Sequence, residues 1–198
     1  DPEQKTHLLQ SYAKNCLSSD NVSGFLDDVQ ETIPENVVSK DSYWDLIFDS
    51  KRVFESVHSV SSEVQSILES WTKVLTGGME RFVSRYKNGI RIQSIPEFEE
   101  YCYYVAGVVG HMLVELVGET YSRNIPPYMY KSAREYGHFL QTINILKDIY
   151  DDKETENNIY IPRDLLKSVG VSQDNILSGT NEDLASVIDT LLYDQSWS

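Results

Sequence analysis

Hydrophobic residues recur at three- and four-residue spacing along most of the chain, which is the period of an amphipathic helix. Joints rich in serine, aspartate, asparagine or proline separate the periodic segments. Strand-like alternation is nowhere convincing, so the pattern favours an all-α fold, and 198 residues suit a single domain spanning residues 1–198. The predicted helices are Gln4–Cys16, Val22–Ile33, Ser42–Val57, Val60–Tyr86, Pro96–Val117, Tyr130–Asp151 and Glu182–Tyr193.

Two joints carry clear signals for where helices end and begin. Asn88-Gly89 is typical of a left-handed helix stop. Ser94 followed by Glu97 is typical of a helix start, because a serine cap and a carboxylate in the first turn both stabilise that end. The stretch Asp151–Asn158 is polar and acidic, and we expect it to be a loosely ordered loop because its like charges repel one another.

The excess of acidic over basic residues limits the kinds of molecule that this protein is expected to bind. Thirty-one acidic residues against 17 basic ones give a formal net charge of -14. A surface of this kind repels phosphodiester backbones, so nucleic acid is not an expected partner. Divalent cations can still bridge acidic side chains to a phosphorylated small molecule, so metal-assisted phosphate chemistry stays open.

Signals for compartment and membrane are few. The two cysteines, Cys16 and Cys102, cannot build a disulfide framework and belong to no metal-ligand motif, which favours a reducing, cytoplasmic location. The longest apolar stretch, Val105–Gly118, has only 14 residues and contains a histidine and a glutamate. A spanning helix needs about 20 apolar residues, so we expect no transmembrane helix in this chain.

A stripe of oxygen-bearing side chains marks the end of the helix predicted near Asp151. Asn144, Asp148 and Asp152 are four residues apart, so they share one helix face and rise by about 6 Å per step. Two carboxylates and an amide suit Mg²⁺, which completes its shell with water and substrate phosphates. A solvated acidic helix end has the same spacing. Acids at a helix C-terminus cost about 0.3–1 kcal/mol each against the helix dipole, which favours a functional reason.

A second unusual segment lies in the helix that begins near Pro96. Gly107 and Gly110 each cost about 1 kcal/mol relative to alanine inside a helix, so something must approach the backbone closely. Two explanations for these glycines remain possible at this point: tight packing of helices and a ligand groove. Val105, Val109 and Leu113 form an apolar row that is either ordinary core or, beside a metal-bound phosphate, a trough for a long hydrocarbon.

Together these segments resemble the squalene/phytoene synthase family. The matching motifs are YCYYVAGVVG (101–110), GHFLQTINILKDIYDD (137–152) and IYIP (159–162), and the resemblance is clearest over residues 79–166. It implies an isoprenoid-synthase-type helical bundle around a central cavity, truncated here at both ends. It also implies Mg²⁺-dependent, head-to-head condensation of two farnesyl or geranylgeranyl diphosphates to squalene, phytoene or a related hydrocarbon, through a cyclopropyl diphosphate intermediate. NADPH would be a second cofactor if the product is squalene, and product release would involve peripheral contact with a membrane.

The resemblance also assigns roles to residues of this sequence. Tyr101 would lie near the reacting allylic carbons, and Gln141 would line the same cavity. Lys147 would hold a departing diphosphate, and the prenyl chain would contact a further set of small and apolar residues. That set is Val105, Ala106, Val109, Gly110, Leu113, Ala133, Gly137 and Leu140, and the expected metal ligands are Asn144, Asp148, Asp152 and Asp1.

Two departures from the family pattern bear on this interpretation. Asp1 matches only the last aspartate of the first acidic motif, and Asn157-Asn158 stand where the family often has a phosphate-contacting arginine, although Arg163 lies nearby. The competing hypothesis is a non-catalytic helical family member that acts as an assembly or interaction factor. The presence of Asn144, Asp148 and Asp152 favours the enzyme.

Overall fold

The structure, a computed structural model, describes residues 2–17, 21–33, 42–122, 124–178 and 181–193. Within these ranges the chain is all-helical, as predicted, and the sole strand-like pairing is an isolated parallel bridge between Arg91 and Ile159. The elements are α1 (Pro2–Ser11), η1 (Tyr12–Leu17), α2 (Val22–Thr32), α3 (Ser42–Phe48), α4 (Ser50–His58), α5 (Ser62–Arg85), α6 (Ile95–Cys102), η2 (Tyr103–Gly107), α7 (Val108–Thr120), α8 (Pro127–Glu156), α9 (Arg163–Ser168), η3 (Gln173–Ser178) and α10 (Asn181–Tyr193).

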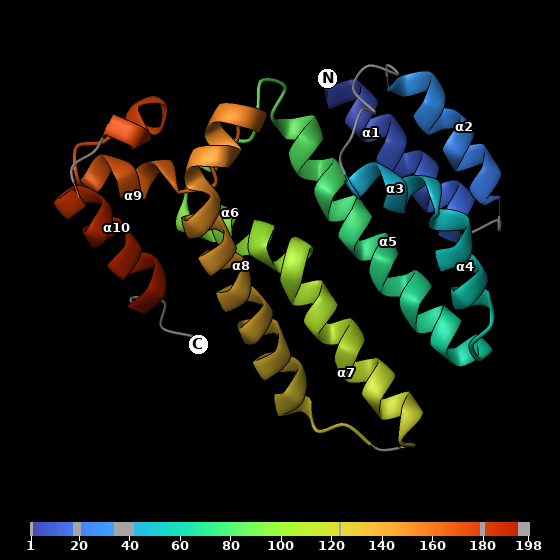
Figure 1. Cartoon of the computed structure of the whole chain (residues 1–198). Helices are drawn as coiled ribbons and strands as arrows, with labels where there is room; N and C mark the ends of the chain where they lie inside the picture. Colours follow the sequence, from blue (N-terminus) through green and yellow to red (C-terminus); the bar gives the residue numbers. More distant parts are fainter. Residues whose placement is uncertain (1, 18–20, 34–41, 123, 179–180, 194–198) are drawn as a thin grey trace.

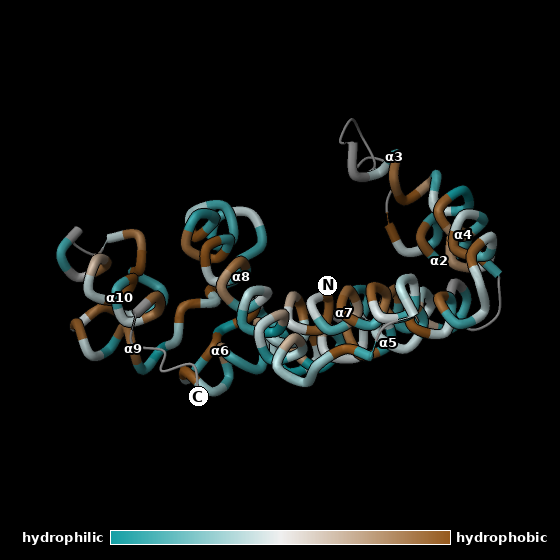
Figure 2. Tube along the Cα trace, turned by 90° about the horizontal axis from the view of Figure 1, so that it is seen from below, coloured by the Kyte–Doolittle hydropathy of each residue, from teal (hydrophilic) through white to brown (hydrophobic). Residues whose placement is uncertain are grey.

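The two longest helices and α7 form the middle of the molecule. Figure 1 shows α5 and α7 side by side, with α8 along the other flank of α7, and contacts join α5 to α7 and α7 to α8. Figures 1 and 2 both place α2, α3 and α4 at one end and α9 and α10 at the other. The main hydrophobic core lies toward the α9 and α10 end, where Phe82, Phe98 and Leu166 are almost fully buried.

The sequence pattern placed most helix boundaries well. Ser94 caps α6 by accepting a hydrogen bond from the backbone N–H of Glu97, as predicted. Gly89 follows α5 with a φ of +94°, and a side chain there would overlap the carbonyl oxygen of Asn157. Two predictions were wrong in detail: the helix expected over 42–57 is divided at Asp49 into α3 and α4, and α9 and η3 were not foreseen.

The acidic stretch after Asp151 is helical rather than a loop, which corrects the prediction. Helix α8 runs on to Glu156 and ends at Asn157, which adopts the left-handed conformation with φ +54°. The physical reason lies in composition, because lysine and glutamate are good helix formers and asparagine tolerates the left-handed cap. The helical propensity therefore outweighs the charge repulsion in this stretch.

The structure also revises the expectation about apolar length. Helices α6, η2 and α7 are continuous over Ile95–Thr120, and this 26-residue helix is long and apolar enough to cross a membrane, judged by length and composition alone. The prediction counted only the uninterrupted apolar run and so underestimated the helix. Phe98, Cys102 and Val108 on it are buried against other parts of the protein, but only 22% of its apolar window is buried.

Candidate functional site

The acidic stripe of α8, Asn144, Asp148 and Asp152, carries negative charge that nearby cations compensate only in part. Asp148 lies 3.4 Å from the Lys147 ammonium, and that lysine side chain is 70% exposed. Asp152 is half-buried, and its pKa is raised to about 6, first by burial and then by the charges of Glu156, Asp148 and Asp151. Asn144 lies exposed on the same helix, two turns before Asp152. The stripe would therefore be stabilised by a cation.

The donor chemistry of this stripe fits Mg²⁺ bound together with a phosphate. Across the described ranges no three His, Cys, Asp or Glu side chains lie close enough to hold a metal ion by themselves. Mg²⁺ commonly takes only one or two protein carboxylates and completes its shell with water and substrate phosphates, so Asp148, Asp152 and the Asn144 amide are an adequate set. Asp1, the remaining expected ligand, lies outside the described residues.

Tyr101, on α6, lies beside the acidic stripe. Its ring stacks on that of Tyr160 with centroids 4.6 Å apart and an interplanar angle of 25°, and it meets Phe82 edge-on at 5.2 Å. Burial, followed by the neighbouring Tyr160, raises the pKa of Tyr101 far above that of a free phenol, and Asp152 contributes in the same direction. Tyr101 is therefore a neutral hydrogen-bond donor at physiological pH. Asp152 lies near enough to Tyr101 to influence it electrostatically, and the catalytic role of Tyr101 stays a prediction.

Tyr160 is a site residue that sequence reasoning did not assign. Burial raises its pKa to about 12, with further contributions from Glu156 and Asp152 that are partly offset by hydrogen bonds from Tyr101 and Asn158. The Asn158 amide donates to the Tyr160 hydroxyl at 3.0 Å and to Glu156 at 2.8 Å. The IYIP motif was the available signal, but it did not show that this tyrosine packs on Tyr101.

Asn158 has a structural role where the family pattern would place an arginine. It is 5% exposed, and its side-chain oxygen accepts a hydrogen bond from the backbone N–H of Ile90 at 2.8 Å. The backbone of Ile159 donates to Ile90 at 2.8 Å, and that of Ile92 donates to Ile159 at 3.2 Å. These bonds hold the segment after α8 against the segment before α6 and so fix Tyr160 over Tyr101.

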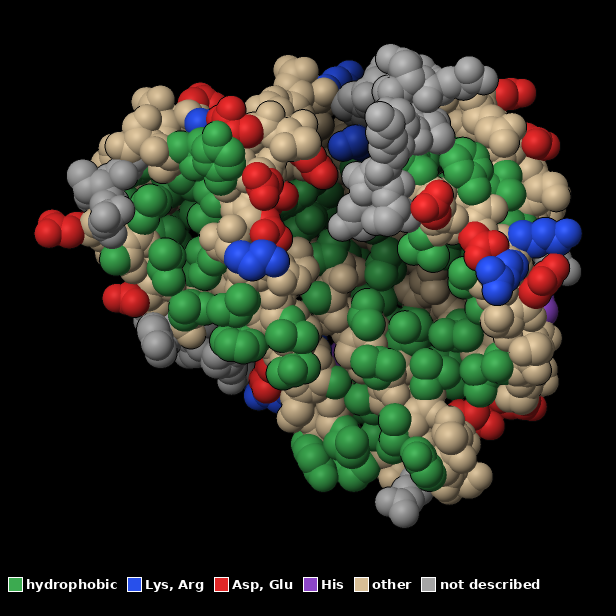
Figure 3. Space-filling model, in the orientation of Figure 1, with side chains coloured by type: hydrophobic (Ala, Val, Ile, Leu, Met, Phe, Trp, Pro, Cys, Tyr) green, Lys and Arg blue, Asp and Glu red, His purple; other side chains and the backbone are tan. Residues whose placement is uncertain are grey.

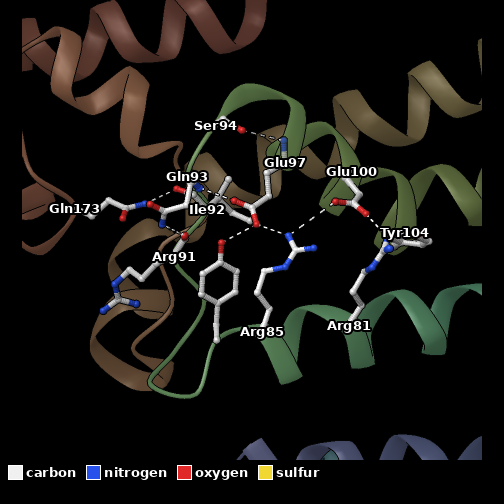
Figure 4. Close-up of polar contacts among 11 residues, drawn as sticks. Arg81, Arg85, Arg91, Ile92, Gln93, Ser94, Glu97, Glu100, Tyr104 and Gln173 are labelled. Carbon is white, nitrogen blue, oxygen red and sulfur yellow. Dashed lines mark hydrogen bonds and ion pairs between the residues drawn. The ribbon is translucent and has the colours of Figure 1, made fainter.

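A charged network around Glu97, four residues before Tyr101, positions the start of α6 (Figure 4). The Glu97 carboxylate accepts hydrogen bonds from Arg85 at 2.5 Å, from the Tyr86 hydroxyl at 2.7 Å and from the Gln93 backbone N–H at 2.7 Å. Burial opposes ionisation of Glu97, but these donors outweigh it and hold the pKa of the carboxyl below its ordinary value. The network ties the end of α5 to α6.

The small residues predicted to line a prenyl tunnel lie at the crossing of η2 and α7 with α8. A side chain at Gly110 would overlap the Ala133 carbonyl, and one at Gly137 would lie 2.6 Å from the Ala106 carbonyl oxygen. The predicted close approach is thus confirmed, and helix packing accounts for these four residues. Their contact with substrate stays a prediction.

The apolar row faces outward along the same helix pair. Val105 and Val109 are half-buried, whereas Leu113 on α7 is 54% exposed and Leu140 on α8 is 44% exposed. Figure 3 shows hydrophobic side chains gathered over this face around a hollow, with acidic side chains at its upper margin. Gln141 is half-buried on α8 between this face and the acidic stripe. An apolar surface and an acidic end therefore adjoin.

Comparison with known proteins identifies the family of this chain. Residues 4–194 match the family model described as "Squalene/phytoene synthase". Phytoene synthase 3, chloroplastic, of Zea mays is 40% identical over 90 residues, which cover 45% of this chain and 21% of that protein. Squalene synthase clz20 of Cochliobolus lunatus is 32% identical over 135 residues, which cover 66% of this chain and 31% of that protein.

Solved structures extend the likeness to the whole fold. The structure of TcSQS with a bound ligand superposes with a TM-score of 0.67 at 18% identity, covering 98% of this chain and 58% of that one. The chain thus spans about a third or less of the two curated relatives and 58% of the solved protein. Because the family model matches nearly the full length of this chain, the chain belongs to the squalene/phytoene synthase family.

Proposed function

We propose that the protein to which this chain belongs is a head-to-head prenyltransferase that uses Mg²⁺ to bind two allylic prenyl diphosphates. The observation that carries the proposal is the position of Asp152, which interacts electrostatically with Asp148 on one side and with Tyr101 and Tyr160 on the other. A metal–diphosphate end is thereby joined to buried aromatic groups and to an apolar face. Those are the parts that a prenyl diphosphate requires.

The residues of this chain divide the task by their chemistry. Asp148, Asp152 and Asn144 would hold Mg²⁺, which when bound neutralises diphosphate charge and assists its departure. Lys147 is exposed next to Asp148 and can contact a diphosphate oxygen as a point charge. Tyr101 keeps its proton and donates it in a hydrogen bond to Tyr160, and the stacked rings of these two tyrosines offer aromatic groups that suit a cationic hydrocarbon.

The chemical outcome that we propose is joining of the two prenyl units through a cyclopropyl diphosphate to squalene, phytoene or a related hydrocarbon. Family membership supports it, and squalene would additionally require reduction by NADPH. The apolar face over α7 and α8 supports a hydrocarbon substrate, because Val105 and Val109 on it begin one turn after Tyr101. The alternative of a non-catalytic assembly factor would leave the acidic stripe without a ligand.

Binding of a prenyl diphosphate in the presence of Mg²⁺ tests the proposal. Asp148→Asn and Asp152→Asn should each weaken Mg²⁺-dependent binding of farnesyl diphosphate by at least about tenfold, as loss of metal-site partners typically does. Asp189→Asn, an exposed carboxylate on α10, is the matched control and should bind as the unmodified chain does. Product analysis with farnesyl and geranylgeranyl diphosphates and the full-length protein then identifies the hydrocarbon. Binding that depends neither on Mg²⁺ nor on the two substituted aspartates would favour the hypothesis of a non-catalytic assembly factor.

A further inference from the structure

A second polar cavity lies outside the site described above. It has a volume of about 520 Å³, within the ordinary range for small-molecule sites, and lies between the segment before α6, helix α9 and the turn that leads into η3. Its charged and polar lining includes Arg91, Gln93, Arg163, Lys167, Ser172 and Asp174. None of these residues belongs to the acidic stripe or to the Tyr101–Tyr160 stack. The proposed function does not use this cavity.

Arg91 is held in place at the wall of the cavity. Its guanidinium donates to the Ile90 carbonyl at 3.0 Å, to the Asn157 side-chain oxygen at 2.6 Å and also to the Asn157 carbonyl. Figure 4 shows Arg91 turned away from the Glu97 network. Three of the five N–H donors of an arginine are used in these bonds, and two remain for a ligand. The cation is thus ordered before any ligand arrives, which reduces the entropic cost of binding.

Two more cations come from α9. Arg163 and Lys167 are four residues apart and exposed, so they project from one face of that helix toward the same cavity. Arg163 donates to the Gln93 side-chain oxygen at 3.3 Å, and Gln93 in turn donates to the Arg91 carbonyl. The side chain of Gln93 therefore links the Arg163 guanidinium to the backbone of Arg91 at the wall of the cavity.

The charge of this cavity opposes that of the molecule. Three cations face a single carboxylate, Asp174, so two positive charges are left uncompensated in a chain whose formal net charge is -14. Guanidinium groups match the oxygens of a phosphate in pairs, and lysine adds a point charge. We propose that this cavity is a metal-independent binding site for a small molecule that carries a phosphate or diphosphate group.

The site differs in chemistry from the acidic stripe, where a diphosphate needs a divalent cation. Titration with inorganic pyrophosphate in EDTA, without divalent cations, therefore isolates it. The Nε–Hε NMR signals of Arg91 and Arg163 should shift during the titration, and the shifts should fit one pyrophosphate bound per chain. The double variant Arg163→Ala and Lys167→Ala should weaken binding by at least tenfold, and both side chains are exposed, so the fold should persist.

Matched controls separate this site from general charge effects. The double variant Arg52→Ala and Lys131→Ala removes the same charge from exposed ion pairs on α4 and α8, and it should bind pyrophosphate within twofold of the unmodified chain. Asp152→Asn should also leave this binding intact, whatever the fate of the proposed prenyltransferase activity. Equal loss in the control variant, loss in Asp152→Asn, absence of a shift at Arg163, or equal affinity for citrate would each overturn the proposal.

Discussion

At the residue scale, the site depends on groups whose protonation is set by their neighbours. Burial and three nearby carboxylates make Asp152 a weaker acid than a free aspartate, while burial keeps the proton on Tyr101. The two effects place a carboxylate that favours cations next to a phenol that stays neutral. Each residue alone is ordinary, and the function we propose depends on the electrostatic interaction between them.

The raised pKa of Asp152 predicts how stability depends on pH without metal. Because the folded state holds the proton up to about pH 6 and the ordinary value is 3.8, the free energy of unfolding should fall as pH rises between these values. Asp152→Asn mimics the protonated form, so its melting temperature should exceed that of the unmodified chain at pH 7.5 and equal it at pH 3.5. Thermal scans across this range measure the difference, with Asp189→Asn as the control for net charge. Equal melting temperatures at pH 7.5 would contradict the prediction.

The sequence located these residues but did not show which side chains surround them. Asn144, Asp148 and Asp152 could be placed on one face from their spacing, and Tyr101 was assigned by resemblance. Tyr160 and Asn158 were missed as site residues because their roles depend on contacts with Tyr101 and Ile90, about 60 or more positions away in the chain. Local periodicity carries no information about such pairs.

At the scale of elements, the crossing of α7 with α8 determines how closely the apolar row on η2 and α7 approaches α8, which carries the acidic stripe. Gly110 and Gly137 each lie against a carbonyl of the other helix, which only glycine permits at this distance. The sequence predicted this close approach from the cost of glycine within a helix. It did not predict the length of α8, because charge repulsion was weighed above the helix-forming tendency of lysine and glutamate.

Two glycine substitutions test the crossing. Gly110→Ala should lower the free energy of unfolding by about 1–3 kcal/mol, because its new methyl group would overlap backbone atoms of Ala133 and Arg134 that cannot move cheaply. Gly77→Ala is the control, since nothing lies within 4 Å of a side chain there and α5 should gain up to about 1 kcal/mol. Urea unfolding measures both. Similar effects at the two positions would show that the helices can separate without cost.

At the scale of the whole molecule, hydrogen bonds join segments that are distant in the chain near the α9 and α10 end. The Gln173 side chain is 8% exposed and donates to the carbonyls of Ile92 at 2.7 Å and Ile161 at 3.0 Å. Those two residues flank the bridge that carries Tyr160 over Tyr101. A buried amide in η3 therefore supports the site indirectly, through its hydrogen bonds to the backbone beside the bridge.

Replacing this amide should loosen the site and the fold together. Gln173→Met keeps the side-chain size but removes both hydrogen bonds, and it leaves buried carbonyl oxygens with fewer donors, so the free energy of unfolding should fall by about 1–3 kcal/mol. Gln65→Met is a close control, because that amide also donates to two carbonyls, those of His58 and Val60, but at an exposed position. Its cost should stay near 0.5 kcal/mol, about the limit for surface changes. Urea unfolding followed by tyrosine fluorescence measures both variants, and equal losses would mean that the buried amide contributes no more than a solvated one.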